Sequence, residues 1–481
     1  MNSPRHKPKF PTFSINALAI SCFAVFGALT ATQASAKTTV QPIEFGKCGE
    51  GLIKSAEVRA LAQCGQIVVA QDRSKPNGKM LTLPVMRIPA KGDKVREPIF
   101  FLTGGPGASN LGDILPLGRV HNSHDVYFVG YRGADGSSVL TCSEISAEIG
   151  KELILSPKGL DGLGKAASSC AARLTSSGFD LGQFTMLNVI DDLEQARVGI
   201  GAEKINLLSL SYGSRVAQYY ARRHSNTILR SAMFGANPPG HFVFSAYVND
   251  KVVDRLAALC VLDKSCSSQT KDLKKTIYLA LTAGSRTGNP KIDDGAVRIA
   301  MFLLLYGRDG TKMFLNAAVS AENGDYSGLE QASELVRQTF KDNIFGDMFT
   351  KGSTDSYRYN LLKDSFALTD SSVGSPIDIL YSTFTSNWPV ALLPAEYRTA
   401  AMDLTPTLIV SGGIDVATPP IFVEAELMPY LPNGKHIVIK DYGHNDFTRQ
   451  ADAFGEILAG FFSDGSINTS LLTEDAYSFD K

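Results

Sequence analysis

The sequence has no excess of charge of either sign. Its 481 residues contain 47 Lys and Arg against 48 Asp and Glu, so it offers neither a basic field for nucleic acid nor an acidic solvating tract. No internal repeat or low-complexity segment is evident. Hydrophobic residues make up 44% of the chain, which is enough for one large globular unit or two modest domains. Partners must therefore be inferred from local sites.

Long apolar stretches are missing beyond the first 36 residues. A membrane span needs about 18 uncharged apolar residues, so none is predicted in the rest of the chain. The amino-terminal segment has basic residues, then an apolar run from Ile15 to Leu29, and then Ala34-Ser35-Ala36. This order is typical of a secretory signal peptide. We expect residues 1–36 to be removed and the mature chain to be periplasmic or secreted, without stable membrane insertion; an uncleaved amino-terminal anchor is the alternative.

Metal-ligand spacing is also missing. The sequence has no CxxC pair and no histidine cluster, so neither a metal nor an organic cofactor is implied. Six cysteines remain once Cys22 leaves with the signal peptide, and in an oxidising compartment they predict three disulfide bonds. The sequence alone leaves the connectivity open. Pairing of chain neighbours would join Cys48 to Cys64, Cys142 to Cys170, and Cys260 to Cys266.

The pattern of apolar runs predicts an α/β fold. An antiparallel hairpin is expected first, because Pro76-Asn77-Gly78 separates two apolar runs. Short apolar runs followed by glycine-rich turns and helix-like segments then predict a parallel sheet with crossover helices. These runs are Ile99 to Leu102, Val126 to Val129, Ile205 to Leu210, Leu408 to Val410 and His436 to Ile439.

The strand pattern is interrupted in the middle of the chain. Residues 241–389 contain long amphipathic segments, such as Val297 to Leu305, which predict a largely helical cap. We expect residues 37–240 and 390–481 to form the two parts of an α/β core, with the cap inserted between them. The polar tail after Phe462 is expected to be loosely held.

A candidate nucleophile lies in the segment Ser209-Leu210-Ser211-Tyr212-Gly213, between a predicted buried strand and a helix. A nucleophile elbow needs small residues two positions either side of the serine, because the strained turn crowds them against a neighbouring strand and helix. Gly213 meets this requirement, and Ser209 replaces the usual first glycine. Taken alone, the pattern fits an ordinary strand-to-helix turn better, so its context has to decide.

A glycine-rich loop gives the first supporting context. Thr103-Gly104-Gly105-Pro106-Gly107 follows the predicted strand Ile99 to Leu102. In α/β-hydrolases such a loop supplies one backbone N–H of the oxyanion hole, and the residue after the nucleophile supplies the other. We therefore assign Gly105 and Tyr212 as the donors. A phosphate-binding loop is the alternative, but the GxGxxG and Walker patterns are absent.

The order of an acid and a histidine gives further context. Asp415 follows the predicted strand Leu408 to Val410, and His444 follows the next one. Serine, then acid, then histidine is the chain order of α/β-hydrolases. We expect Ser211 to be the nucleophile, His444 the general base and then acid, and Asp415 the carboxylate that orients the imidazole. Considered separately, Asp415 could be an ordinary turn residue and His444 an ordinary surface histidine.

Other candidates for the same roles lie nearby. Asp441 and Asp446 flank His444 and are alternative acids. His436 is a poor candidate for the base, because it is predicted to lie inside or at the start of a strand.

These motifs together resemble the proline iminopeptidase and tripeptidyl aminopeptidase family of serine peptidases. The matching segments are Gly104 to Gly107, Tyr131-Arg132-Gly133, Asp192-Leu193-Glu194, Ser211 to Ala217, Gly413 to Asp415 with Thr418-Pro419, and Gly443-His444. The resemblance implies an α/β-hydrolase with a helical cap and an aminopeptidase activity. It also implies a disulfide bond between Cys142 and Cys170. Departures from the family pattern are Gly130 in place of an aspartate, Ser209 in place of a glycine, and Asn445 after the histidine.

The substrate remains the least determined property. Family exopeptidases hold the free amine with acidic cap residues, and the cap offers four acidic side chains that solvated helix faces explain equally well. These are Glu322, Asp325, Glu330 and Glu334. We expect a serine hydrolase that acts on peptides from the amino terminus. A carboxylic ester hydrolase with the same triad, or a non-catalytic binding protein, is the alternative, and the oligomeric state is left open.

Overall fold

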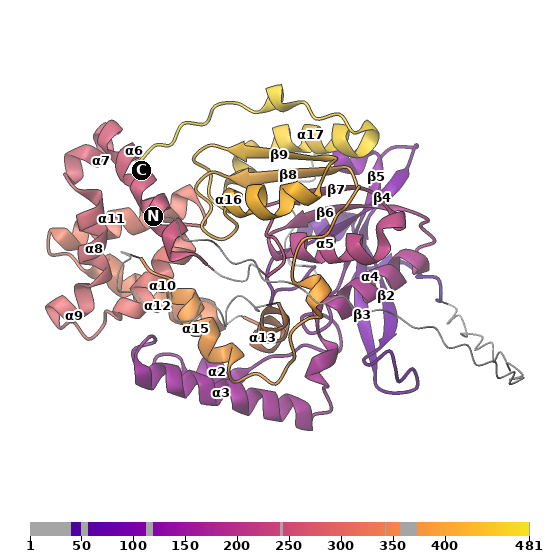
Figure 1. The fold of residues 1–481 in the computed structure, drawn as a ribbon, viewed down its shortest axis with the longest axis horizontal. Coiled ribbons are helices and arrows are strands. Elements are labelled where there is room, and N and C mark those ends of the chain that lie inside the picture. Colours follow the sequence, from indigo (N-terminus) through magenta and orange to yellow (C-terminus); the bar gives the residue numbers. More distant parts are fainter. Residues whose placement is uncertain are drawn as a thin grey trace, which may run out of the picture. The chain divides into compact units, whose positions relative to one another are not determined.

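The computed structural model describes residues 40–49, 56–111, 119–240, 244–341, 343–355 and 373–480. Residues 40–481 form one compact unit, and the predicted signal peptide lies outside the described residues. A nine-stranded sheet runs through the described part of this unit, and helices cover both of its faces (Figure 1). None of the described helices is both long enough and apolar enough to cross a membrane.

The sheet has the strand order of an α/β-hydrolase. Its order is β1-β2-β3-β5-β4-β6-β7-β8-β9, with antiparallel pairing from β1 to β5 and parallel pairing from there to β9. The strands are β1 (Gly46–Lys47), β2 (Gln63–Ala70), β3 (Met80–Ile88), β4 (Arg96–Leu102), β5 (His124–Val129), β6 (Ile205–Leu210), β7 (Ile228–Phe234), β8 (Thr407–Gly412) and β9 (Gly434–Ile439). The predicted hairpin around Asn77-Gly78 and the predicted parallel sheet are both confirmed.

The central strands are predominantly apolar because both faces of the sheet are covered. Successive side chains alternate between the faces, so Phe100 packs in one core cluster and Phe101 in the other. The cluster around Phe100 also contains residues of α4 (Met186–Gly199) and α5 (Tyr212–His224). The cluster around Phe101 contains the apolar face of α17 (Ala451–Asp464).

Local sequence sets where several helices begin. The side chain of Ser156 accepts a hydrogen bond from the N–H of Gly159 and so caps α3 (Pro157–Ser176), whose first position is a proline. Asp293 caps α10 (Asp294–Leu304) by accepting from Gly295 and Ala296. Other helices outside the segment between β7 and β8 are α1 (Ala56–Leu61), α2 (Ser143–Glu148) and α16 (Pro420–Phe422).

The described chain between β7 and β8 is largely helical. In Figure 1 most of these helices gather at the end of the unit away from β2 and β3. They include α10, which covers the predicted amphipathic segment from Val297 almost to its end at Leu305. The cap boundaries at residues 241 and 389 stay a prediction. The helices are α6 (Ala246–Leu262), α7 (Lys264–Gln269), α8 (Leu273–Leu281), α9 (Ala283–Thr287), α10, α11 (Arg308–Glu322), α12 (Ser327–Lys341), α13 (Phe345–Thr354) and α15 (Pro376–Thr385).

The expectation of a loosely held tail is wrong. Beyond α17 the chain runs across to the helices that follow β7 (Figure 1). The N–H of Phe479 donates to Asp263 at 3.2 Å, and Lys312 donates to the carbonyl of Asp480 at 3.0 Å. Phe479 itself is only 7% exposed. A few apolar and carboxylate anchors therefore hold a segment that looks polar in sequence.

All three disulfide bonds between chain neighbours are present. They join Cys48 to Cys64, Cys142 to Cys170, and Cys260 to Cys266. The second bond ties α3 to the residue that precedes α2, and the third ties α6 to α7.

Loss of the Cys142–Cys170 bond should lower the free energy of unfolding more than loss of the Cys260–Cys266 bond. The two bonds close separations of 28 and 6 residues. Loop-closure entropy then gives about 3.5 kcal/mol for the longer loop and about 2 kcal/mol for the shorter one. Urea unfolding of the two double Cys→Ser variants, compared with the parent chain, measures both values. The reverse order would contradict this expectation.

Candidate active site

Ser211 occupies a sharp turn between β6 and α5. Its backbone has φ 54° and ψ −124°, a conformation that non-glycine residues rarely adopt. The turn is held by its neighbours, because the N–H of Ser211 donates to Phe234 of β7 at 2.9 Å. The Ser211 carbonyl accepts from both the N–H and the hydroxyl of Ser214, at 2.9 and 2.6 Å. The predicted elbow geometry is therefore present.

Gly213 and Ser209, the small residues on either side of Ser211, are required or tolerated for different structural reasons. A Cβ at Gly213 would lie 2.0 Å from the carbonyl oxygen of Leu102, so no larger residue fits without moving β4 away from α5. Ser209 is fully buried, and its hydroxyl donates to the carbonyl of Ala232 in β7 at 3.2 Å. The departure at position 209 is thus accommodated by one hydrogen bond to the neighbouring strand.

The glycine-rich loop lies directly beside Ser211. A Cβ at Gly104 would be 3.2 Å from the Cβ of Ser211. The start of the loop is fixed by the buried side chain of Asn110, which accepts from the N–H of Thr103 at 2.7 Å. The same side chain donates to the carbonyls of Phe101 and Val129, at 3.1 and 2.9 Å. Asn110 therefore joins the loop to the ends of two strands.

His444 and Asp415 form a buried pair. Nδ1 of His444 lies 2.8 Å from Oδ2 of Asp415, and the two residues are 5% and 1% exposed. The carboxylate also accepts from the N–H groups of Ala417 and Thr418 and from the Thr418 hydroxyl. Burial alone would raise the pKa of the Asp415 carboxyl. The charge and hydrogen bond of His444, together with the bonds from Thr418, outweigh burial and hold this pKa below its usual value.

The alternative acids and the alternative base have other partners. Asp441 receives two hydrogen bonds of 2.7 Å from the guanidinium of Arg255 in α6. Asp446 accepts from the N–H groups of Gly443 and Arg308, at 2.7 and 3.1 Å. His436 lies within β9, where its Nε2 is 2.9 Å from the hydroxyl of Ser411.

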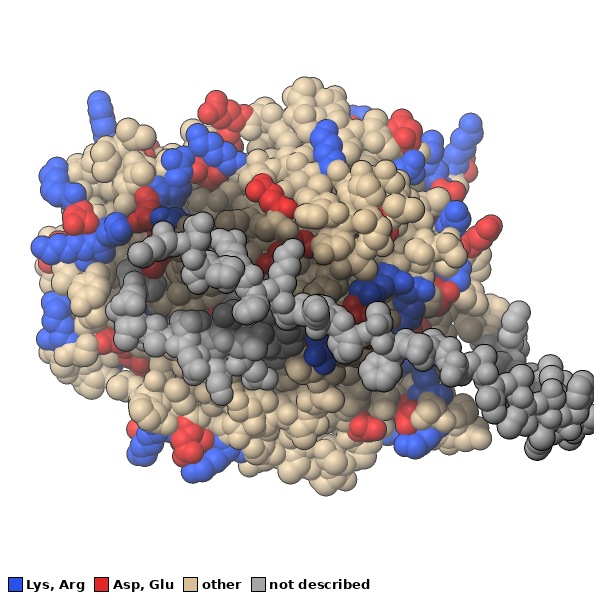
Figure 2. Space-filling model, in the orientation of Figure 1, with Lys and Arg blue, Asp and Glu red and all other residues tan. Residues whose placement is uncertain are grey.

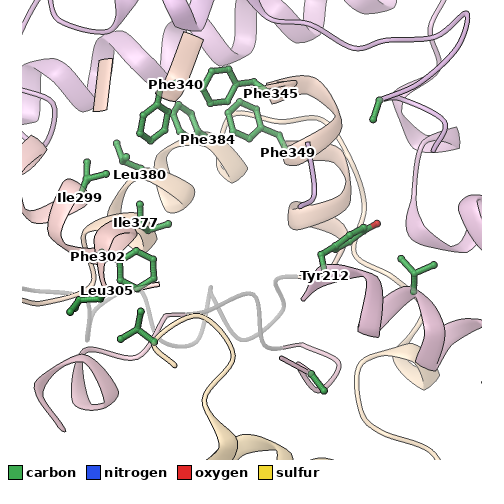
Figure 3. Packing of buried hydrophobic residues seen from close by; sticks show 14 of the residues in the cluster. Tyr212, Ile299, Phe302, Leu305, Phe340, Phe345, Phe349, Ile377, Leu380 and Phe384 are labelled. Carbon is green, nitrogen blue, oxygen red and sulfur yellow. The ribbon is translucent and has the colours of Figure 1, made fainter. Parts of the chain in front are cut away.

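One cavity of about 350 Å³ brings the candidate residues together. Ser211, Gly105 and His444 all line it, and most of the remaining wall comes from the helices between β7 and β8. Tyr212 begins α5 next to Ser211 and lies across from the phenylalanines of that wall in Figure 3. Aromatic and aliphatic side chains predominate. They include Phe244, Phe302, Leu303, Phe340, Phe345, Met348, Ile377, Leu380 and Phe384.

Acidic side chains are absent from the described wall of this cavity. The four acidic residues considered from the sequence lie elsewhere. Glu322 accepts from Thr276, Asp325 accepts from the N–H of Ser327, and Glu330 accepts from Asn289. Glu334 pairs with Arg337 within the same helix. On the face shown in Figure 2, acidic and basic side chains are interspersed, as the balanced composition suggests.

Comparison with known proteins agrees with the resemblance seen in the motifs. Residues 379–475 match the family described as TAP-like protein. The chain is 23% identical over 431 residues to the serine protease Hip1 of Mycobacterium tuberculosis, which covers 79% of this chain and 81% of that protein. It is 31% identical over 180 residues to the tripeptidyl aminopeptidase of Streptomyces lividans, covering 33% and 32% of the two chains. These matches indicate a serine hydrolase that is similar to proteins of the TAP-like family.

Solved structures resemble this chain more distantly. A thermophilic esterase from Thermogutta terrifontis is 12% identical, with a TM-score of 0.37 over 82% of this chain and 97% of that chain. The assignment of the α/β-hydrolase fold rests on the strand order of the sheet itself.

Helix α13 and the residue before it hold the glycine loop at Gly107. The N–H of Gly107 donates to Oδ2 of Asp347 at 3.0 Å, and its carbonyl accepts from Ile344 at 3.2 Å. Asp347 also pairs with Lys351, and both side chains are fully buried. Burial raises the pKa of the Asp347 carboxyl, although Lys351 acts in the opposite direction. The sequence pattern did not identify this pair, whose i,i+4 spacing is common on solvated helices.

A second buried ion pair joins the end of α13 to the elbow helix. Arg215 of α5 pairs with Asp355, and the two side chains are 1% and 0% exposed. Asp355 also accepts from the hydroxyl of Tyr219 at 2.6 Å and from the N–H of Gly240 at 3.2 Å. The helix that carries part of the cavity wall is therefore fixed to the helix that carries Ser211.

Substitution of Gly213 by alanine should destabilise the protein strongly. The added methyl group would lie 2.0 Å from the Leu102 carbonyl oxygen, so β4 and α5 would have to separate. We expect a loss of at least about 2 kcal/mol in the free energy of unfolding. Gly46→Ala is the matched control, because nothing lies within 4 Å of a Cβ there. Thermal melting of both variants measures the effect, and a Gly213→Ala variant as stable as the control would refute the close contact.

Proposed function

We propose that this protein is an exported serine peptidase that releases N-terminal residues or short peptides through an acyl-enzyme. The supporting observation is a serine on a strained turn lining the same cavity as a histidine that is hydrogen-bonded to a buried carboxylate. The names of the two relatives, a serine protease and a tripeptidyl aminopeptidase, favour peptides as substrates.

The proposed roles follow from the hydrogen bonds of the imidazole. Nδ1 of His444 faces Asp415, so Nε2 is the nitrogen that accepts the proton of Ser211 as its hydroxyl oxygen attacks the substrate carbonyl. The same nitrogen then delivers that proton to the leaving amine. Because its pKa is lowered, Asp415 is ionised at neutral pH, which favours the Nδ1–H tautomer and stabilises the imidazolium.

The proposed oxyanion hole consists of the backbone N–H groups of Gly105 and Tyr212. Tyr212 is the first residue of α5, where the N–H groups have no partner within the helix and the helix dipole is positive. Gly105 belongs to the loop that lies against Ser211. Each such donor typically stabilises the transition state by about 3 kcal/mol.

Export is part of the same proposal. The amino-terminal segment has the pattern of a secretory signal peptide, and three disulfide bonds are compatible with an oxidising compartment outside the cytoplasm.

A carboxylic ester hydrolase is the second candidate. It is favoured by the wall of the cavity, where the described residues include no carboxylate that could hold a substrate amine. The same serine, histidine and oxyanion donors serve ester and amide hydrolysis, so substrate measurements must separate the two.

Replacement of Asp415 by asparagine should reduce kcat by about 10⁴-fold, as loss of the orienting carboxylate does in other serine hydrolases. Asp441→Asn is the matched control, because Asp441 lies on the same loop as His444 and pairs with Arg255 instead. We expect the control to lose less than tenfold. Steady-state kinetics on one substrate tests this, and an equal loss in both variants would refute the assignment of the acid.

The substrate class is tested with a matched panel. It contains aminoacyl and tripeptidyl coumarylamides with free or blocked amines, and p-nitrophenyl esters with the same acyl groups. We expect free-amine amides to be the preferred substrates and Ser211→Ala to abolish turnover and labelling by a fluorophosphonate. Ser209→Ala serves as the matched control, because that hydroxyl faces β7. Turnover of esters alone would establish the second candidate, and no labelling of the parent chain would indicate a non-catalytic protein.

A further inference from the structure

The glycine loop after β4 has little order of its own, yet it must hold one N–H group in a fixed direction. Gly105 and Gly107 have φ values of 127° and 86°, in a region that favours glycine. Glycine loses more conformational freedom on folding than any other residue. Among the described residues the N–H of Gly105 donates to no protein acceptor, which leaves it available to an oxyanion. The loop therefore has to be ordered by residues outside it.

The start of α13 supplies this order at Gly107. The N–H of Gly107 donates to Oδ2 of Asp347 at 3.0 Å, and its carbonyl accepts from the N–H of Ile344 at 3.2 Å. The backbone also lies close to the helix, because a Cβ at Gly107 would be 2.9 Å from the Cβ of Met348. Both polar groups of Gly107 are thus fixed two positions from Gly105. Since the intervening proline has a fixed φ, a shift at Gly107 is passed on to Gly105.

The loop after β5 meets the same carboxylate. A Cβ at Gly133 would overlap Oδ1 of Asp347, so the carboxylate fits here only against a glycine. Lys351, one turn further along α13, pairs with Asp347 and donates to the carbonyl of Arg132 at 3.0 Å. Its ammonium group also lies 5.4 Å from the centre of the Tyr131 ring. Tyr131-Arg132-Gly133, which has no part in the triad, therefore helps to enclose the ion pair.

Burial makes this ion pair an expensive way to stabilise a helix. Both side chains are at most 1% exposed, and the attraction between two buried charges offsets only part of the loss of water. Apolar side chains of similar volume often stabilise a protein equally well or better. An apolar pair would, however, offer no acceptor to the N–H of Gly107. This acceptor is the property that distinguishes Asp347 and Lys351 from an apolar pair.

We propose that Asp347 and Lys351 are a positioning pair for the oxyanion hole. Asp347 holds Gly107, and Lys351 keeps the carboxylate in place, so that the N–H of Gly105 points at the developing oxyanion. This inference rests on the proposed function, because it assumes that Gly105 and Tyr212 receive that charge. Neither Asp347 nor Lys351 belongs to the described wall of the cavity, so the pair acts through the glycine loop.

Two double variants isolate the hydrogen bond to Gly107. Asp347→Asn with Lys351→Met keeps an acceptor oxygen, whereas Asp347→Leu with Lys351→Met removes it. Neither double variant leaves an unpaired buried charge, which would destabilise a single variant. Loss of a whole oxyanion donor lowers kcat by about a hundredfold to a thousandfold, and a displaced donor should lose part of this. We expect kcat of the leucine variant to be about tenfold to a hundredfold below that of the asparagine variant, with KM changed less than about threefold.

A transition-state analogue gives a readout that a merely structural role would not move. A trifluoromethyl ketone with the acyl group of the best substrate adds to the Ser211 hydroxyl and places its oxyanion between the two donors. From the asparagine variant to the leucine variant, its Ki should rise by the factor by which kcat/KM falls. Active sites are counted by the end point of fluorophosphonate labelling, so loss of folded protein does not enter the comparison. If the leucine variant fails to fold, Asp347→Ala with Lys351→Met replaces it under the same expectation.

Thr350→Val is the matched control on the same helix. Thr350 is fully buried in α13, and its hydroxyl accepts from Nε1 of Trp388 at 2.9 Å. Loss of this hydrogen bond should lower the melting temperature and leave kcat and Ki within about threefold of the parent values.

The outcomes separate this inference from the proposed function. Equal kcat and Ki in the leucine and asparagine variants would overturn the positioning role and leave the peptidase intact. An equal loss in the Thr350→Val control would do the same. Hydrolysis of esters alone by the parent chain, with the leucine variant impaired as expected, would support the positioning role and overturn the peptidase. A parent chain that fluorophosphonate does not label would overturn both.

Discussion

The active site depends first on the close contact between β4 and α5. Gly213 leaves room for the carbonyl oxygen of Leu102 at a distance that no side chain would allow. This contact brings the end of β4, and the glycine loop that follows it, against the turn at Ser211. Because both segments leave the same edge of a parallel sheet, a nucleophile and a loop of backbone donors become neighbours. The strain at Ser211 is sustained by the strands and the helix around it.

The helices between β7 and β8 do more than cover the site. Asp347 of α13 accepts a hydrogen bond from the N–H of Gly107. At the end of the same helix, Asp355 forms an ion pair with Arg215 of α5. The start of α11 binds the loop of His444, where the N–H of Asn445 donates to Tyr306 and Arg308 donates to the Asp441 carbonyl. The same helices line the cavity. Cavity shape and the positions of the glycine and histidine loops are therefore coupled through a small number of hydrogen bonds and buried ion pairs.

The sequence predicted what is encoded locally. The sheet, the turn at Ser211 and the helices after β7 follow from apolar periodicity and glycine placement, both of which act over a few residues. The Asp347–Lys351 pair and the anchoring of Phe479 depend on segments far apart in the chain. A buried charge and a solvated one look alike in sequence when the packing partner is distant. The serine at position 209 likewise depends on a partner distant in the chain, because its hydroxyl donates to the carbonyl of Ala232 in β7.

Three aspartates near His444 illustrate how packing decides between chemically equal candidates. Each finds a different partner: the imidazole for Asp415, the Arg255 guanidinium for Asp441, and two backbone N–H groups for Asp446. Burial raises the pKa of Asp446, whereas the imidazole and Thr418 bonds overcome burial at Asp415. Only Asp415 thus combines contact with the ring and a pKa that keeps it charged. The other two carboxylates fix the loop on either side of the histidine, so the imidazole is oriented by a shared arrangement in which a single carboxylate faces the ring.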